Sequence, residues 1–208
     1  MLIEHQGRRP QVAASAYVAP NAVVAGDVVL GEDCRILFGA VVTAEAGGTV
    51  GLGERVIVME QAVVRGRAGH PAVVGRHVVV GPHAHINGAV IGDRAFIATG
   101  ASVFPGARIG TGAEVRINGV VHVNSVLPEE ATVPIGWVAV GDPAHILPPS
   151  DHAGISAVQQ TLDFVGTVYG VQQGPPAEEL AEITRRYADL FGRHRDDRVI
   201  ARSTEASA

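Results

Sequence analysis

A six-residue apolar repeat runs from about Val12 to Leu127. An aliphatic residue, which we call the anchor, recurs at every sixth position, with two wider spacings and one shorter one. A small residue stands four places after most anchors. A period of six is too short for a helix and a loop, but it suits one short strand and a turn. The anchors are Val12, Val18, Val24, Leu30, Ile36, Val42, Leu52, Val58, Val64, Val74, Val80, Ile86, Ile91, Ile97, Val103, Ile109, Val115, Val121 and Leu127.

Three such units make one coil of a triangular solenoid, and successive coils stack at about 4.8 Å, the spacing of paired strands. Each coil buries its anchors against its neighbours, so stability is a near-neighbour sum along the axis. The repeat therefore predicts an all-β parallel β-helix. A β-sandwich is the alternative, but its alternating strands do not predict a spacing of six.

Two insertions interrupt the repeat, at Ala44–Gly51 and Gly66–Val73. Both segments are rich in glycine, which is typical of loops. They are one coil apart, so we expect both loops to leave the same corner of the solenoid, one above the other. This register places Val42, Val64 and Ile86 in one column.

The C-terminal third has a different pattern. We expect the β-helix and its cap to span residues 1–149, an extension to span 150–192 and a disordered polar tail to span 193–208. Two prolines precede a predicted helix at about residues 176–191, and Gly192 can end it. Its apolar face must pack on the solenoid or on a partner subunit; this face consists of Leu180, Ile183, Tyr187, Leu190 and Phe191.

Composition narrows the function classes. The net charge of −5, without long charged runs, gives no footprint for nucleic acid. One cysteine, Cys34, excludes an internal disulfide and is compatible with a reducing cytosol. The sequence contains no apolar stretch near twenty residues and no signal-peptide pattern. We therefore expect a cytoplasmic protein that binds neither membrane nor nucleic acid.

The repeat, the two corner loops, the five-residue step from Ile86 to Ile91 and the motif VAVGDPA resemble the γ-carbonic anhydrase-like branch of the hexapeptide-repeat proteins. The resemblance covers about Leu2–Pro149. It implies a left-handed parallel β-helix that packs as a homotrimer, with the helix axes side by side. The hand comes from the resemblance, because periodicity does not reveal it.

The resemblance also implies a zinc ion held between two subunits by three histidines. The matching positions here are Arg65, Pro82 and Asn87. Proline cannot ligate a metal, and the guanidinium is permanently charged and repels a cation. We therefore expect no metal at the usual site, no cofactor, and no CO₂ hydration by the family mechanism. Zinc or another divalent metal held elsewhere remains an alternative.

The substituted positions suggest a binding site of another kind. Arg65 and Asn87 follow anchors of one column, so they should stack, with Thr43 one coil below. A guanidinium and an amide at a subunit interface suit a small anion or carboxylate. The alternative is a static ion pair between Arg65 and Glu60 or Glu45. The ligand-binding candidates are Arg65, Asn87, Glu60, Glu45, Pro82 and His83, and no catalytic residue is assigned.

Three other functions remain open. An acyltransferase of the hexapeptide-repeat class would need a histidine base, for which His70, His83 and His122 are candidates; the sequence lacks an evident basic patch for coenzyme phosphates. A noncatalytic scaffold would use the C-terminal helix as its docking surface. A carbonic anhydrase with a relocated metal would use His83 and His85. The sequence shows no partner pattern for His5, His145, His152 or His194.

Overall fold

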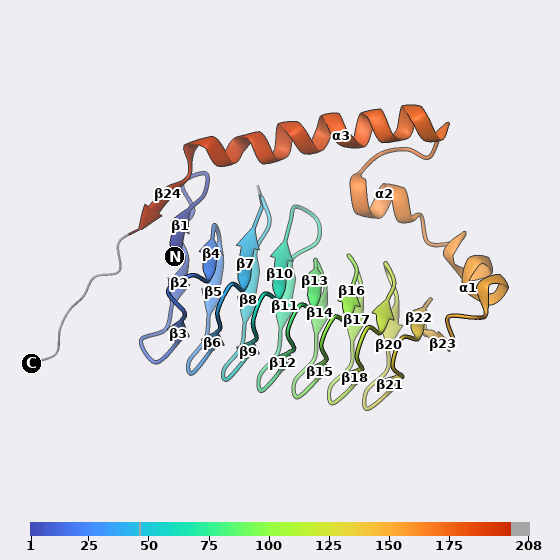
Figure 1. The fold of residues 1–208 in the computed structure, drawn as a ribbon, viewed down its shortest axis with the longest axis horizontal. Coiled ribbons are helices and arrows are strands. Elements are labelled where there is room, and N and C mark those ends of the chain that lie inside the picture. The colour runs from blue at the N-terminus through green and yellow to red at the C-terminus, as the bar shows by residue number, and fades with distance from the viewer. Residues whose placement is uncertain (46, 201–208) are drawn as a thin grey trace, which may run out of the picture.

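The computed structural model describes residues 1–45 and 47–200. The chain winds into a solenoid of short strands (Figure 1), whose three faces are each a sheet of stacked strands. The first face is a ten-stranded sheet of β23 (His145–Leu147), β22 (Val138–Val140), β19 (Val120–Val121), β16 (Ser102–Val103), β13 (His85–Asn87), β10 (Val63–Gly66), β7 (Val41–Ala44), β4 (Val23–Ala25), β1 (Leu2–Glu4) and β24 (Arg198–Ile200).

The other two faces are seven-stranded sheets. One contains β2 (Gln11–Val12), β5 (Val28–Leu30), β8 (Val50–Leu52), β11 (Ala72–Val74), β14 (Val90–Ile91), β17 (Arg108–Ile109) and β20 (Val126–Leu127). The other contains β3 (Tyr17–Val18), β6 (Arg35–Ile36), β9 (Ile57–Val58), β12 (Val79–Val80), β15 (Phe96–Ile97), β18 (Glu114–Val115) and β21 (Thr132–Val133).

The anchors form the core, as the repeat predicts. Val42, Val64 and Ile86 pair directly across β7, β10 and β13 and are fully buried, which confirms the predicted column. Cys34 is buried in a small-residue position, where burial raises the pKa of its thiol. The interior is therefore filled by stacked aliphatic side chains, each layer packing on the next.

The two inserted loops lie one above the other, also as predicted. The Glu45 amide donates to the Gly66 carbonyl at 2.9 Å, and the Ala72 amide donates to the Thr49 carbonyl at 3.0 Å. The two loops also approach closely at Gly48, where an added Cβ would lie 2.3 Å from the Cα of Arg67. Glycine is therefore required at this position for the loops to pack.

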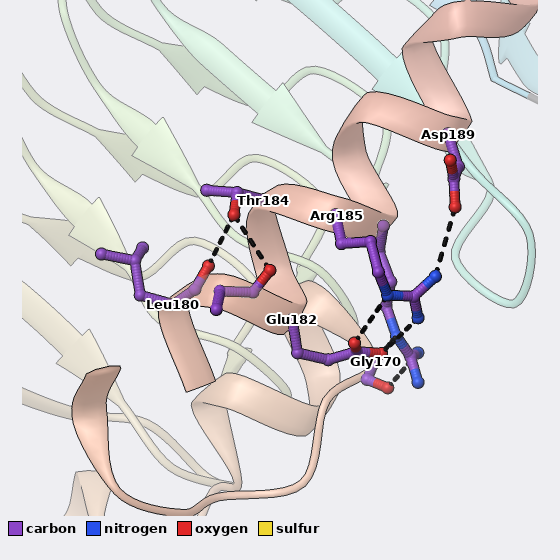
Figure 2. A network of polar contacts seen from close by, with 8 residues as sticks. Gly170, Leu180, Glu182, Thr184, Arg185 and Asp189 are labelled. Atoms are coloured by element: carbon purple, nitrogen blue, oxygen red, sulfur yellow. Dashed lines mark hydrogen bonds and ion pairs between the residues drawn. The ribbon is translucent and has the colours of Figure 1, made fainter. Parts of the chain in front are cut away.

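The C-terminal extension contains α1 (His152–Gln159), α2 (Phe164–Tyr169) and α3 (Pro176–Gly192), which agrees with the predicted helix. α3 runs back along the solenoid, from the last coils to the first (Figure 1). On the exposed side of α3, Glu182 forms ion pairs with Arg185 and Arg186, at 2.8 and 2.6 Å (Figure 2). Hydrogen bonds from these arginines lower the pKa of Glu182 to about 2.

Residues 193–200 differ from the expected disordered tail. They form a 3₁₀ turn, η1 (Arg193–Asp196), and then β24, which pairs antiparallel with β1 in the register Leu2↔Ile200 and Glu4↔Arg198. The edge strand β1 offers unpaired backbone groups, and β24 satisfies them. Residues 201–208 of the predicted tail lie outside the described residues.

Among the described residues, no helix combines the length and apolar character needed to cross a membrane.

The column geometry predicts the cost of a core truncation. Replacing the fully buried Ile86 by alanine should lower the free energy of unfolding by about 2–5 kcal/mol, because it leaves a cavity between two coils. Val90→Ala is the control, since Val90 is 43% exposed on the next strand. Urea denaturation measures both variants, and equal losses would contradict the assignment of Ile86 to the core.

Candidate functional site

In the ten-stranded sheet, the residues one place after the anchors stack on one another along the solenoid. Arg65 pairs with Thr43 on one side and with Asn87 on the other, which confirms the predicted stacking. The same register continues toward the C-terminal coils, where Ile86 pairs with Val103 and Val103 pairs with Val121. The residues after these anchors are Phe104 and His122. We call Thr43, Arg65, Asn87, Phe104 and His122 the outer column.

Aromatic side chains of the C-terminal extension lie along the outer column. At one end, the Phe164 ring is 5.6 Å from Phe104 and 5.3 Å from His122. At the other end, Phe191 of α3 lies 5.8 Å from the Arg65 guanidinium carbon. Ring contacts link these ends without a gap. We call this line of rings the aromatic seam; its members are Phe164, Tyr169, Tyr187, Phe191 and His194.

The seam accounts for part of the predicted apolar face of α3. Tyr187 and Phe191 belong to it, whereas Leu180 is 60% exposed at the start of the helix. A second tie holds α2 against the solenoid, because the Arg67 guanidinium donates to the carbonyls of Thr167 and Val168. The extension therefore covers the outer column through packed rings and buried hydrogen bonds.

Arg65 is paired within its own chain. Its Nε lies 3.6 Å from a carboxylate oxygen of Glu45, a residue that is 4% exposed. The ion pair that the sequence left as an alternative is thus present, and its partner is Glu45. Two buried polar atoms beside it, Arg65 Nε and Asn87 Oδ1, have no hydrogen-bond partner among the described residues. Such atoms need a partner such as water or a ligand.

The remaining candidates from the sequence lie apart from this pair. Glu60 is in the turn between β9 and β10, where its carbonyl accepts from the His83 amide at 3.1 Å. Pro82 is half-buried, and its carbonyl accepts from Gly100. Among the described residues, no ion pair joins Glu60 to Arg65.

His83 and His85 do not form the pair expected of a relocated metal site. His83 is exposed in a turn with a φ of +58°, and β13 begins only at His85. The alternation of side chains along a strand therefore does not apply to them. Within the described part of the chain, the one group of three metal-ligating side chains lies elsewhere, at His5, Glu45 and His194.

No sequence pattern predicted the cluster of His5, Glu45 and His194. Asp197 joins its two imidazoles, with one carboxylate oxygen 2.6 Å from His5 Nδ1 and the other 2.7 Å from His194 Nδ1. His194 Nε2 lies 3.1 Å from Glu45, and the two imidazole rings stack at 4.4 Å. His5 is 2% exposed. These residues come together because β24 pairs with β1, a contact that no local sequence motif predicts.

The cluster shifts two pKa values in opposite directions. Burial disfavours the charged form of His194, but the hydrogen bond to Asp197 and the charge of Glu45 raise its pKa overall. Burial likewise opposes ionisation of Asp197, yet hydrogen bonds from His194 and His5 lower its pKa. The two shifts favour a charged Asp197–His194 pair when no other cation is present.

His122 lies at the other end of the outer column, in an apolar groove of about 540 Å³. Burial lowers the pKa of His122, which keeps the imidazole neutral at pH 7. Its Nδ1 is buried without a hydrogen-bond partner among the described residues. The lining residues are Ser102, Phe104, Val120, His122, Gln159 and Phe164.

Comparison with known proteins identifies the architecture. No family model matches the chain. A UDP-N-acetylglucosamine O-acyltransferase of Moraxella catarrhalis superposes with a TM-score of 0.53 at 15% identity, over 89% of this chain and 90% of that one. A hexapeptide transferase family protein of Anaplasma phagocytophilum gives a TM-score of 0.34 at 20% identity, over 91% and 98% of the two chains.

The chain is a left-handed parallel β-helix of the hexapeptide-repeat type. In sequence, it is 39% identical to a carbonic anhydrase of Geobacillus kaustophilus over 49 residues, which are 24% of this chain and 27% of that protein. The match thus covers about a quarter of the relative. The superposition on the Moraxella catarrhalis acyltransferase supports the fold alone, and the function has to be argued from the side chains.

The pKa of His194 predicts a pH dependence of stability. Its folded-state pKa is above the ordinary value of 6.5, so its stabilising contribution is complete below that pH and is lost as pH rises through the folded-state value. With a chelator present, the melting temperature of the protein should fall above pH 6.5. His194→Gln should remove this slope, and an identical slope in both proteins would contradict the assignment.

Proposed function

We propose that this protein is an acyltransferase of the hexapeptide-repeat class that binds the apolar part of its donor in the groove beside His122. The observation that carries the proposal is a buried, neutral imidazole at the wall of an open groove lined by aromatic rings. Apolar walls with a few polar groups are typical of small-molecule sites. The names of the similar structures support only the fold, because their identities are 15–20%.

His122 is suited to general-base catalysis. Its Nε2 would accept the proton of a hydroxyl or amine acceptor while the acceptor attacks the carbonyl carbon of an acyl thioester. The new C–O or C–N bond forms, the C–S bond breaks, and the imidazolium returns the proton to the leaving thiolate. Phe104 and Phe164 would hold the acyl chain, and Gln159 and Ser102 are the polar groups at the groove wall.

The donor class follows from the groove. Its lining contains no arginine or lysine, so the phosphates of a coenzyme A donor would lie outside it. In the homotrimer that we also propose from the resemblance, a neighbouring subunit would complete the groove. The acyl chain would then be the part of the donor that this chain recognises.

A second candidate function is the binding of a small carboxylate or other anion at the subunit interface, around Arg65, Asn87, Glu60, Glu45, Pro82 and His83. The unpartnered Arg65 Nε and Asn87 Oδ1 support it, because a ligand would satisfy both. The Glu45 carboxylate weighs against it, since it already offsets the Arg65 charge and repels anions. The groove at His122 is therefore the stronger candidate.

The acyltransferase proposal predicts separate effects on binding and on turnover. Full-length protein should bind medium-chain acyl-coenzyme A and release free thiol in the presence of amine acceptors. His122→Ala should leave binding within a few-fold and slow thiol release by about 10²–10⁴-fold, the contribution of a positioned base. Phe164→Ala should weaken binding, because it removes one wall of the groove.

The matched control is His145→Ala, which removes an exposed histidine of β23 outside the groove. It should change neither quantity. Calorimetry measures binding, and a thiol-reactive dye follows release. Absence of acyl-coenzyme A binding at millimolar concentration, or thiol release that survives His122→Ala, would overturn the proposal.

The anion candidate predicts a thermal shift. A carboxylate or phosphate at 100 times its dissociation constant should stabilise the protein by about 2.7 kcal/mol, and Arg65→Ala should abolish the shift. Arg76→Ala is the control, because Arg76 is an exposed arginine paired with Asp93. No shift with any anion would exclude this second function and leave a noncatalytic scaffold as the alternative to the enzyme.

A further inference from the structure

We propose that His5, Glu45 and His194 form a binding site for a divalent transition-metal ion, with zinc the best fit. One ligand atom of each residue lies within 4.8 Å of the others. Two imidazoles and one carboxylate are a frequent ligand set for zinc. None of these residues stands at the three positions where the resemblance implies histidines. The proposal also revises the expectation of a protein without metal.

Asp197 sets the protonation of both imidazoles. Each of its carboxylate oxygens contacts the Nδ1 atom of one histidine, at 2.6 Å for His5 and 2.7 Å for His194. A carboxylate only accepts hydrogen bonds, so both Nδ1 atoms carry the proton. In the neutral rings, the lone pair is then on Nε2, the nitrogen that does not contact Asp197. A carboxylate behind a histidine is the usual outer support of a metal ligand.

The Nε2 atom of His5 provides an independent observation. His5 is 2% exposed, and its Nε2 is buried without a hydrogen-bond partner among the described residues. A buried polar atom without a partner destabilises the fold, because its contact with water is lost and not replaced. A cation in the cluster would satisfy this atom. The Nε2 lone pair thus points to a ligand and not to a further protein contact.

The contact between His194 and Glu45 points the same way. His194 Nε2 is 3.1 Å from a Glu45 oxygen. With a neutral ring protonated on Nδ1, two lone pairs face each other at this distance; either a metal ion or a proton on Nε2 removes that repulsion. Tetrahedral ligands about 2.0–2.1 Å from zinc lie roughly 3.3–3.4 Å apart, so side-chain rotations would have to bring the three atoms from within 4.8 Å of one another to that spacing.

Backbone pairing brings the proposed ligand residues together independently of any metal. In the β1–β24 ladder, Glu4 pairs with Arg198, so the next position places His5 opposite Asp197. Glu45 follows β7, which is two strands away from β1 across β4. The residue that follows β4 is Gly26, where an added Cβ would lie 2.4 Å from the Ala44 carbonyl oxygen. Gly26 therefore places no side chain between His5, which follows β1, and Glu45, which follows β7.

The cluster has access to solvent. A cavity of about 340 Å³ is lined by His5 and Glu45 and also by Asp27 and Thr49. Such a cavity gives the ion an entry path and leaves room for a water ligand at a fourth position. A site with three protein ligands and an open position can bind an exchangeable ligand, whereas purely structural zinc sites are closed by four protein ligands.

A protonated His194 is the competing explanation. As an imidazolium, it would pair with Asp197 and Glu45 and need no metal. Arg65, 3.6 Å from the other Glu45 oxygen, also supplies positive charge. That arrangement accounts for His194 but leaves His5 Nε2 without a partner. His5 therefore distinguishes the two explanations.

The test uses the full-length protein, stripped with a chelator, at pH 7.5 so that protons do not compete for the imidazoles. Calorimetric titration with zinc sulfate should show one site per chain, and the melting temperature should rise with zinc. His5→Gln and Glu45→Gln should weaken zinc binding at least tenfold. Asp197→Asn, which changes only the outer support, should weaken it by about 10–100-fold.

The controls are His83→Ala and His77→Ala, which remove exposed histidines away from the cluster. Neither should alter zinc binding. His5→Gln keeps an N–H group for Asp197, so the β1–β24 contact should persist, and the circular dichroism spectrum checks the fold. Substituted Co²⁺ should give the absorption spectrum of a four-coordinate nitrogen and oxygen site.

Three results would overturn the proposal. They are no zinc binding by the native protein, zinc binding that His5→Gln leaves unchanged, and zinc binding that His83→Ala abolishes. The first favours the imidazolium, the second an adventitious surface site and the third the alternative site at His83 and His85.

Discussion

The parallel ladder between successive coils is the constraint on which the rest of this structure depends. Because each coil repeats the same hexads, a residue one place after an anchor always stands at the same corner of the prism. Arg65 thereby stacks on Thr43 and under Asn87, and the same corner later presents a phenyl ring and an imidazole. The repeat specifies only the buried anchors, so the residues that follow them can differ in type and still stack in one column.

The C-terminal extension makes this column into a covered surface. α3 returns along the solenoid, and its aromatic seam lies over the column from His122 to Arg65. The last strand then pairs with the first strand of the chain and closes the exposed sheet edge. As a result, the two ends of the seam differ. One is an apolar groove with a neutral histidine, and the other is a charged cluster that contains two stacked imidazoles.

The sequence predicted the solenoid, the anchor column, the stacked loops and the last long helix, because each depends on local periodicity or spacing. It also predicted that Arg65, Asn87 and Thr43 would stack. It left the partner of Arg65 undecided between Glu60 and Glu45, since side-chain distances across a corner are not periodic. The sequence did not predict the cluster of His5, His194 and Asp197. His5 and Asp197 are 192 residues apart along the chain, and they come together only because β24 pairs with β1. A short polar strand at the end of a chain carries too weak a pattern to be distinguished from a disordered tail.

A direct measurement of the cluster is anomalous diffraction at the zinc edge from a crystal of the native protein grown with one equivalent of zinc. We expect a single strong peak per chain between the Nε2 atoms of His5 and His194 and the Glu45 carboxylate, with β24 paired to β1. A peak at His83 and His85, or between subunits beside Arg65 and Asn87, would contradict it, as would a chain whose last strand is detached from the first.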